Sequence, residues 1–249
     1  MRVVAVWTIK GGVGKTAAAV NLAALAAAEG WRTLLWDLDP QGAASFYFRV
    51  KPKVKGGGRK LLRRSAELRR WIRGTDFDNL DLLPADFSYR RFDLDLDGRR
   101  GPAKRLALKL APLADEYDAV ILDCPPSVSL ASDSVLRAAD ALLVPVIPTT
   151  LSLRSLDQVR SFAAKVGKRD LLVLPFLSMV DRRKTMHREA LEWCHADESF
   201  LRATIPAASV VEKMGLHRAP LLTYAPVSEA AQAFAGLWEE LAVRIALSA

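Results

Sequence analysis

Apolar runs of strand length alternate with helix-type patterns along most of the chain. Eight runs fit strands: residues 2–8, 32–39, 79–85, 119–126, 141–148, 171–180, 201–206 and 221–226. Several of them are apolar at every position, which is typical of strands buried on both faces. Helical patterns cover residues 15–29, where Gly30 can end the helix, and residues 228–247.

Strands separated by helices predict right-handed crossovers between parallel strands. We therefore expect an α/β fold, in which a mostly parallel twisted sheet carries helices on both faces. A chain of 249 residues, 51% of them hydrophobic, is long enough for one domain with a sizeable core. The predicted domain spans residues 1–249. We expect residues 49–74 to form a basic surface loop followed by a basic helix, inserted within that domain.

The charge of the chain indicates a polyanionic partner. A net charge of +8 and a pI near 9.7 are unusual for an enzyme of small molecules and suggest nucleic acid. Lys and Arg are dense in residues 49–74, where Glu67 is the one acid and three successive glycines interrupt the pattern. Cys124 and Cys194 are too few for a disulfide framework, which favours a reduced, cytoplasmic setting.

The stretch VWTIKGGVGKTAAAV, residues 6–20, places a glycine-rich loop between a predicted strand and a predicted helix. Glycines let backbone N–H groups approach phosphate oxygens, and the helix N-terminus adds positive potential. Lys15 is then expected to contact the β- and γ-phosphates, and the Thr16 hydroxyl to hold Mg²⁺. An ordinary phosphate loop does not need Lys10, so this second lysine calls for its own explanation.

A resemblance supplies that explanation. KGGVGKT (10–16) resembles the deviant Walker A motif of the ParA/MinD family of P-loop ATPases, and the chain as a whole resembles the ParA branch. DLDPQG (37–42) matches the motif after the second strand, and ILDCPPS (121–127) matches the Walker B segment. Residues 178–192, 204–206 and 220–231 resemble the C-terminal parts of that family. The resemblance covers nearly the whole chain and is weakest over 49–112.

The resemblance implies a set of site residues. Lys10 reaches the nucleotide of a second subunit, which makes a face-to-face dimer around two ATP molecules, and Asp39 orients the attacking water. These two residues and Lys15 are the catalytic group. The metal site comprises Thr16, Asp39 and Asp123, with Asp37 as an orienting group. The expected ATP-binding residues are Lys10, Gly11, Gly12, Val13, Gly14, Lys15, Thr16, Ala17, Met179 and Pro206, the last two around the base.

The resemblance also implies a function. The protein is expected to be an ATPase with ATP and Mg²⁺ as cofactors that forms a homodimer in the ATP state, binds non-specific DNA and positions or segregates a cargo. The cargo is a plasmid, a chromosome or a protein compartment such as a carboxysome. A cargo-bound activator protein, ParB-like or analogous, stimulates slow hydrolysis, and the protein is cytoplasmic and nucleoid-associated. Candidate DNA contacts are Arg63, Arg64, Arg69, Arg70, Arg182, Arg183, Lys184, Arg188, Lys213 and Arg218.

Three other functions stay open at this point. A membrane-cycling regulator like MinD needs a basic amphipathic C-terminal helix, whereas the last helix here carries Glu229, Glu239 and Glu240. An iron–sulfur carrier needs cysteines placed to share a cluster, and a metabolic P-loop ligase needs a small-molecule co-substrate. No apolar run reaches the roughly 20 residues of a membrane span, and the N-terminus enters a strand without a secretory leader. We therefore expect no membrane partner.

Two further patterns suggest metal binding but lack a complete ligand set. Residues 93–98 begin like a calcium loop, but Lys104 stands where a bidentate Glu is required. His187, Cys194 and His195 share a predicted amphipathic helix with no fourth ligand. We expect them to have ordinary surface or core roles.

Overall fold

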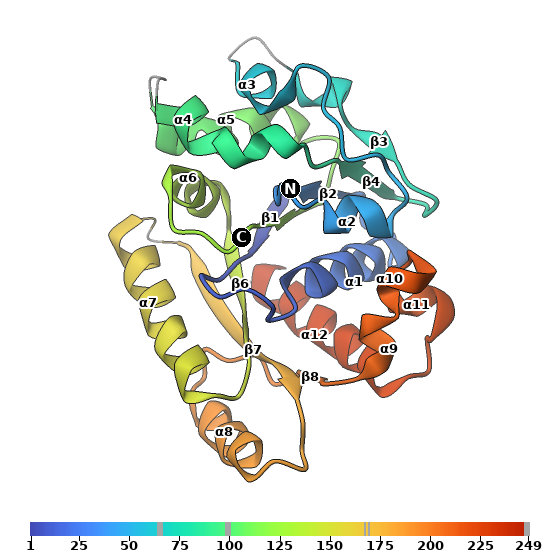
Figure 1. The fold of residues 1–249 in the computed structure, drawn as a ribbon, viewed down its shortest axis with the longest axis vertical. Helices are drawn as coiled ribbons and strands as arrows, with labels where there is room; N and C mark the ends of the chain where they lie inside the picture. The colour runs from blue at the N-terminus through green and yellow to red at the C-terminus, as the bar shows by residue number, and fades with distance from the viewer. Residues whose placement is uncertain (64–66, 98–100, 167, 169, 247–249) are drawn as a thin grey trace.

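An eight-stranded sheet forms the centre of the computed structural model, which describes residues 1–63, 67–97, 101–166, 168 and 170–246 (Figure 1). The order across the sheet is β3-β4-β2-β5-β1-β6-β7-β8, and every neighbouring pair is parallel except β3 with β4. The strands are β1 (Arg2–Val6), β2 (Thr33–Asp37), β3 (Arg73–Gly74), β4 (Leu80–Leu83), β5 (Ala119–Asp123), β6 (Ala141–Val146), β7 (Leu172–Val180) and β8 (Thr204–Pro206).

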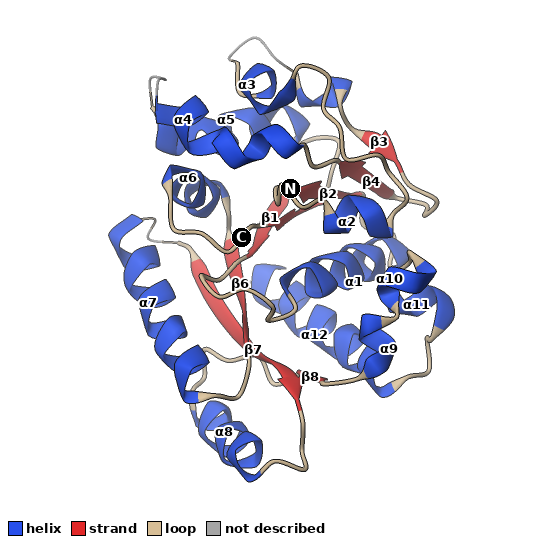
Figure 2. Cartoon of the chain, in the orientation of Figure 1, coloured by secondary structure: helices blue, strands red, loops and turns tan. Residues whose placement is uncertain are grey.

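Helices cover both faces of this sheet, as Figure 2 shows. The longer helices are α1 (Lys15–Ala28), α6 (Leu130–Ala138), α7 (Thr150–Val166), α8 (Thr185–Ala196) and α12 (Glu229–Ala246). The shorter ones are α2 (Ala43–Tyr47), α3 (Gly57–Leu61), α4 (Phe92–Asp97), α5 (Arg105–Leu110), α9 (Ser209–Glu212), α10 (Met214–His217) and α11 (Leu221–Tyr224). None of the helices in the described ranges is long and apolar enough to cross a membrane. The predicted α/β fold class is confirmed.

Alternation along the strands divides the core in two. In β1, Val3 and Ala5 face the cluster formed with α5, α6 and α7, while Val4 and Val6 face the cluster formed with α1 and α12. The helix α1 is buried on almost all sides because its alanines let the sheet and α12 approach closely. It ends as expected, since Gly30 adopts φ 89° and its N–H donates to the Ala27 carbonyl.

The predicted strand at 221–226 is wrong, because the chain forms the single-turn helix α11 there. The buried Leu221 N–H donates to the Asn21 side-chain oxygen of α1 at 2.8 Å, so this segment packs on α1 and joins no strand. The predicted strand at 201–206 is shorter than expected. The N–H groups of Arg202 and Ala203 donate to the Glu240 carboxylate of α12, which leaves Thr204–Pro206 to pair with β7.

The basic segment at 49–74 also differs from the expectation of a loop and a single helix. Its described parts form α3, a turn of 3₁₀ helix at Leu68–Arg70 and the short edge strand β3. The predicted DNA contact Arg64 lies outside the described residues. The segment that begins like a calcium loop is helical from Phe92 to Asp97 in α4, and the Asp93 carboxylate accepts a hydrogen bond from the Ala131 N–H at 2.9 Å. Gly98 lies outside the described residues.

Candidate nucleotide-binding site

The phosphate loop leaves the end of β1 and turns directly into α1. Two of its glycines adopt left-handed backbone, Gly12 at φ 69° and Gly14 at φ 90°, which non-glycine residues rarely tolerate. The loop is held from below by Ser178 of β7, whose hydroxyl donates to the Val13 carbonyl at 2.9 Å. A side chain at Gly14 would meet the Ser178 hydroxyl at 3.0 Å. The loop is therefore preformed, with the N-terminus of α1 open toward an anion.

The two lysines of the loop have different environments. Lys15 is buried, and its ammonium donates to the Lys10 carbonyl at 3.0 Å. Burial lowers the pKa of Lys15, while Asp123 and Asp39 oppose that shift. Lys10 is half-buried and points to the start of α7, where its ammonium donates to the Ser152 hydroxyl at 2.9 Å. One lysine thus belongs to the loop, and the other is directed out of it.

Two carboxylates lie side by side at the end of neighbouring strands. Asp37 of β2 and Asp123 of β5 are paired in register, and both are fully buried on the phosphate-loop face of the sheet. One oxygen of Asp37 accepts hydrogen bonds from the N–H and the hydroxyl of Ser45, at 2.8 and 2.7 Å. The other oxygen of Asp37 and both oxygens of Asp123 have no hydrogen-bond partner among the described residues.

Burial raises the pKa of both carboxyl groups. The pKa of Asp37 rises to about 6, with the hydrogen bonds from Ser45 opposing the shift and Asp39 adding to it. The pKa of Asp123 is raised well above its ordinary value by burial first and by Asp37 second, while the nearby Thr16 hydroxyl works in the opposite direction. Three buried oxygens without partners are costly. An oxygen-only donor set beside Thr16 fits a hard divalent cation such as Mg²⁺.

Asp39 is partly buried and lies two residues beyond the end of β2. Its side chain accepts a hydrogen bond from the Gln41 N–H at 2.9 Å, and its carbonyl accepts one from Gly42, so the turn itself orients the carboxylate. The preceding Leu38 N–H donates to the Asp123 carbonyl at 2.9 Å, which joins the turn to the end of β5. The three aspartates predicted at this site therefore occupy one edge of the sheet.

A cavity of about 330 Å³ adjoins the loop on the side of β7 and β8. It contains Met179 and Pro206, the two residues predicted around the base, together with Gly12, Gly14 and Ala17 of the loop and α1. Met179 has φ 57°, at an irregularity in the pairing of β7 with β8, and the residue is 39% exposed. The structure thus places the two predicted base residues in one cavity with three of the predicted loop residues.

Three serines of the site escaped the sequence analysis. Ser152, Ser178 and Ser45 hold Lys10, the loop and Asp37 respectively. Two of these contacts join residues 142 and 165 positions apart, and a serine in an unremarkable segment carries no local signal of such a partner. They can be found only once the fold is known.

A family model described as an AAA domain matches residues 1–173, which include the phosphate loop and both carboxylate strands. The sporulation initiation inhibitor protein Soj of Bacillus subtilis (strain 168) is 30% identical over 248 residues, covering 97% of this chain and 98% of Soj. The chain belongs to the ParA/MinD family of P-loop ATPases. Members of this family are ATPases, and this chain is a ParA-like ATPase.

Two further proteins extend the comparison within the family. The chromosome partitioning protein ParA of Caulobacter vibrioides is 30% identical over 253 residues, covering 98% of this chain and 95% of the relative. The solved structure of cobyrinic acid a,c-diamide synthase from Mycobacterium smegmatis, with bound ADP and magnesium, has a TM-score of 0.80 at 29% identity. The alignment with that structure covers 97% of this chain and 94% of the synthase.

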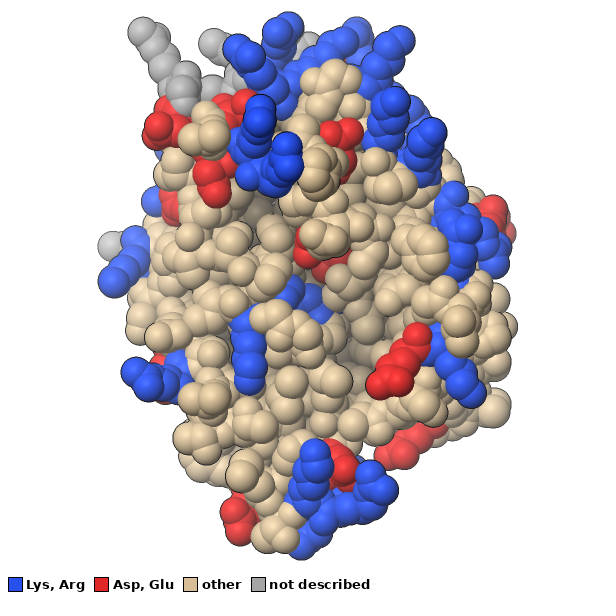
Figure 3. Space-filling view, viewed as in Figure 1, with Lys and Arg blue, Asp and Glu red and all other residues tan. Residues whose placement is uncertain are grey.

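The basic residues predicted to contact DNA do not form one group in this ParA-like chain. Figure 3 shows Lys and Arg gathered at the top and the bottom of the face that carries the nucleotide site. Of the C-terminal candidates, Arg218 stacks on the Phe46 ring at 4.6 Å and donates to the Phe46 carbonyl. Arg183 pairs with Asp181, and Arg188 donates to the carbonyls of residues 182 and 183. The remaining described candidates, Arg63, Arg69, Arg70, Arg182, Lys184 and Lys213, are exposed.

Proposed function

We propose that the protein is an ATP-dependent switch that dimerises around two ATP molecules, binds non-specific DNA in that state and so positions or segregates a cargo. The observation that supports this most directly is the direction of Lys10. Its ammonium lies against α7 and leaves its own phosphate loop to Lys15. A cation held outward at the rim of a nucleotide site is available to the site of a second copy.

A charge argument explains why a second copy is needed. Negative charge on the γ-phosphoryl group and its neighbours must be stabilised as the group is transferred. A cation supplied by another subunit is worth about 10³–10⁵ in rate in comparable systems, or roughly 4–7 kcal/mol of barrier. Lys10 in this role joins hydrolysis to dimerisation, because neither copy is complete alone.

The other residues of the site take positioning roles. Lys15 and the N–H groups of the loop bind the phosphates, and Asp39 orients the attacking water. Thr16 and Asp123 are the residues that hold Mg²⁺, which supplies positive charge to the β- and γ-phosphates when bound. Asp37 stands beside Asp123 and is oriented by Ser45. With positioning as the main means of catalysis, hydrolysis is slow until a cargo-bound activator protein stimulates it.

A second candidate function comes from the similarity to cobyrinic acid a,c-diamide synthase at 29% identity. A ligase of that kind activates a carboxylic acid with ATP and shows little turnover without it. The two functions therefore differ in what stimulates hydrolysis. Turnover that rises with a small carboxylic acid and an ammonia donor, and is indifferent to DNA and protein partners, supports the ligase.

The switch is tested by gel-shift titration of a random DNA duplex with protein in the ATP-bound, ADP-bound and nucleotide-free states. We expect a shift with ATP alone, lost in Lys10→Ala and Lys15→Ala and weakened by added salt. Sedimentation of the same samples should show a dimer with ATP only, and Lys10→Ala should remain a monomer that still binds ATP. Equal DNA retention without nucleotide, or an ATP-loaded protein that stays monomeric, contradicts the switch.

A further inference from the structure

The positive charge of this protein is concentrated in one segment. Residues 49–73 carry eleven of the 36 Lys and Arg residues and one of the 28 Asp and Glu residues. The formal charge of this segment is therefore +10, and the remaining residues, with 25 basic and 27 acidic side chains, sum to −2. The net positive charge of the whole molecule therefore originates in this segment, whose described residues, 49–63 and 67–73, we call the basic cap.

The basic cap is packed against the rest of the domain by buried apolar side chains and by hydrogen bonds. Its apolar side chains, Val54, Leu61, Leu62, Leu68 and Trp71, are at most 4% exposed and belong to the core under α5 and α6. Its backbone is tied down as well, because the N–H groups of residues 54 and 58 donate to the side chains of residues 86 and 88, each at 2.8 Å. The Trp71 indole N–H donates to the carbonyl of residue 55 at 3.2 Å.

The Lys and Arg side chains of the cap extend from this packed segment into solvent. Two arginines at its margins are paired, Arg49 with Asp76 and Arg69 with Glu116. Six others are exposed and form no ion pair with any residue in the described ranges: Lys51, Lys53, Lys55, Lys60, Arg63 and Arg70. Like charges held close together without counter-ions lower stability, and that cost is recovered when they neutralise a bound polyanion.

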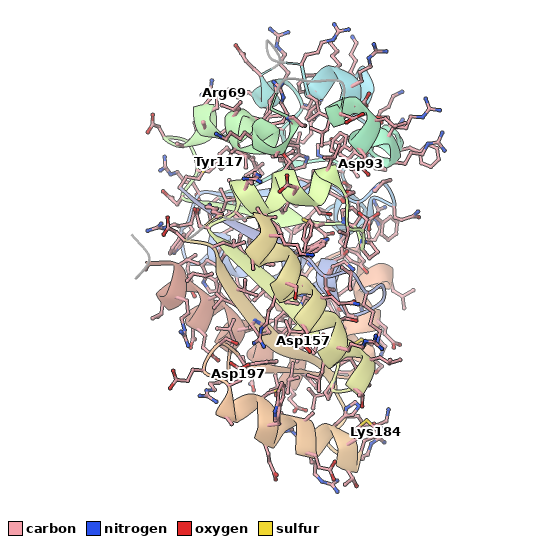
Figure 4. All side chains as sticks on the ribbon, turned by 90° about the vertical axis from the view of Figure 1, so that its left-hand side faces the viewer. Arg69, Asp93, Tyr117, Asp157, Lys184 and Asp197 are labelled. Carbon is pink, nitrogen blue, oxygen red and sulfur yellow. The ribbon has the colours of Figure 1, made fainter. Side chains whose placement is uncertain are left out.

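We propose that the basic cap is the surface that contacts the DNA phosphate backbone, in preference to the basic loop around Lys184. This assignment rests on the proposed function for its partner, a duplex of any sequence. Arg69 in the cap and Lys184 lie at opposite ends of the molecule in Figure 4, so a single phosphate track along one end meets one of them and not both. At the far end, Arg183 and Arg188 are already engaged within the loop.

The chemistry of the cap favours a nucleic acid over a membrane. Proteins that lie on a lipid surface insert exposed apolar side chains between the headgroups, whereas the large apolar side chains of the cap named above are buried. The backbone that carries these cations is already ordered, so it loses little conformational freedom when DNA binds. This lowers the entropic cost of association. Such a surface reads charge and not base identity.

The cap is also fixed relative to the edge of the sheet that carries Asp37, Asp39 and Asp123, which we call the nucleotide edge. The Ser45 hydroxyl that binds Asp37 accepts a hydrogen bond from the Ala85 N–H at 3.0 Å, and the next residue, Asp86, accepts one from the Val54 N–H of the cap. In an ATP dimer the two caps therefore take fixed positions. Two linked patches bind one duplex more tightly than either alone, which ties DNA affinity to the nucleotide state.

The test compares two triple variants with the same loss of charge. The cap variant is K53Q/K55Q/K60Q, and the matched control is R182Q/K184Q/K213Q; all six residues are exposed. Fluorescence anisotropy of a labelled random duplex is measured with ATP and Mg²⁺ across a salt series. At 100 mM salt we expect the cap variant to bind about 30-fold more weakly or worse. The slope of log K against log salt should fall by about 3 if one cap of the dimer contacts the duplex, and by about 5 if both do. The control should stay within about threefold of the unmodified protein.

Circular dichroism and ATP-dependent dimerisation should be unchanged in both variants, which separates a lost contact from a lost fold or switch. Equal losses in the two variants, or a larger loss in the control, overturn the assignment to the cap while the proposed function stands. DNA binding that is the same with and without ATP but is lost in the cap variant supports the cap and counts against the switch. Binding to phosphatidylserine vesicles that the cap variant loses, with DNA affinity intact, identifies a membrane surface and overturns the proposal.

Discussion

The nucleotide edge and the basic cap are both defined by charged residues, yet their charges are handled in opposite ways. At the edge, Asp37, Asp123 and Lys15 are buried, few and individually placed. In the cap, the cations are exposed and numerous, and the six named above form no ion pair within the described ranges. Buried charges respond to protons and bound metal, and exposed charges respond to salt. The same protein therefore carries one site that is sensitive to pH and another that is sensitive to ionic strength.

The difference also concerns redundancy. Removing one of three buried charges leaves the others unpaired in a low-dielectric site, so each single change at the edge should be severe. The cations of the cap each contribute a similar amount to the free energy of DNA binding. The loss of one of them should therefore weaken DNA binding only mildly, and the effects of several losses should be roughly additive. Lysine substitutions at the two places test this contrast directly.

The largest effect is expected from a pair of single substitutions. Lys15→Ala removes charge-assisted hydrogen bonds to two phosphates, each worth about 1.5–3 kcal/mol, so ATP affinity measured by calorimetry should fall about 10²–10⁴-fold. Lys60→Ala, in the cap, should leave ATP affinity unchanged and weaken DNA binding by less than about tenfold at 100 mM salt. An equal loss of ATP affinity in the two variants would contradict the proposed division between the nucleotide edge and the cap.

The next effect concerns the pH dependence of stability at the edge. The pKa of Asp37 is raised from 3.8 to about 6, so the folded protein binds this proton more tightly than the unfolded chain does. Its contribution to stability is therefore fully present below about pH 4 and is lost as the pH rises through 6, by about 2–3 kcal/mol. Urea unfolding of the nucleotide-free protein should show this loss between about pH 4 and pH 7.

Asp37→Asn should reduce that pH dependence, because the amide has no proton to lose, and the slope that remains belongs to Asp123, whose pKa burial also raises. Saturating ATP and Mg²⁺ should offset the loss in the unmodified protein, since a bound cation provides the missing partner for the carboxylates. Stability that rises between pH 5 and 7 in the absence of nucleotide contradicts the assignment.

Much of the edge could be predicted from the sequence, because its determinants are local. Uniformly apolar runs ending in DLD and LDC indicate buried parallel strands with carboxylates at their C-terminal ends. The glycine-rich loop between β1 and α1 indicates the phosphate site in the same way. The failures arose where a partner distant in sequence decides the outcome. The apolar run at 221–226 has the composition of a strand, but the Asn21 side chain of α1 holds it as a helical turn.

The cap was only partly predictable for a related reason. The charge of the cap is evident from its composition. The sequence does not show which of its apolar residues, such as Leu61 and Trp71, are buried, because glycines interrupt the helical spacing of apolar positions. Gly58 shows what the fold requires there, since any side chain at this position would meet the Phe92 ring at 2.3 Å. One of the three glycines that interrupt the pattern is therefore a site of close packing.

A smaller effect is expected at the contact that holds Lys10. In the single subunit its ammonium donates to Ser152, which is itself buried and also accepts from the Thr149 hydroxyl at 3.1 Å. If Lys10 must leave this contact to reach a second nucleotide, Ser152→Ala should ease dimerisation. One hydrogen bond of about 1 kcal/mol per subunit corresponds to a gain of roughly 5- to 30-fold for the dimer. Sedimentation with ATP measures it, and unchanged or weaker dimerisation argues against release.

The smallest effect is expected at Arg218, a basic residue that lies outside both the nucleotide edge and the basic cap and serves as a comparison for them. Its guanidinium lies 4.6 Å from the centre of the Phe46 ring and donates to the Phe46 carbonyl, so it joins the C-terminal part of the chain to α2. Arg218→Ala should lower the free energy of unfolding by about 1 kcal/mol, the sum of a cation–π contact and one hydrogen bond at a partly exposed site. DNA affinity in the ATP state should stay within about threefold. A loss of DNA binding at full stability would place this arginine, and not the cap, against the duplex.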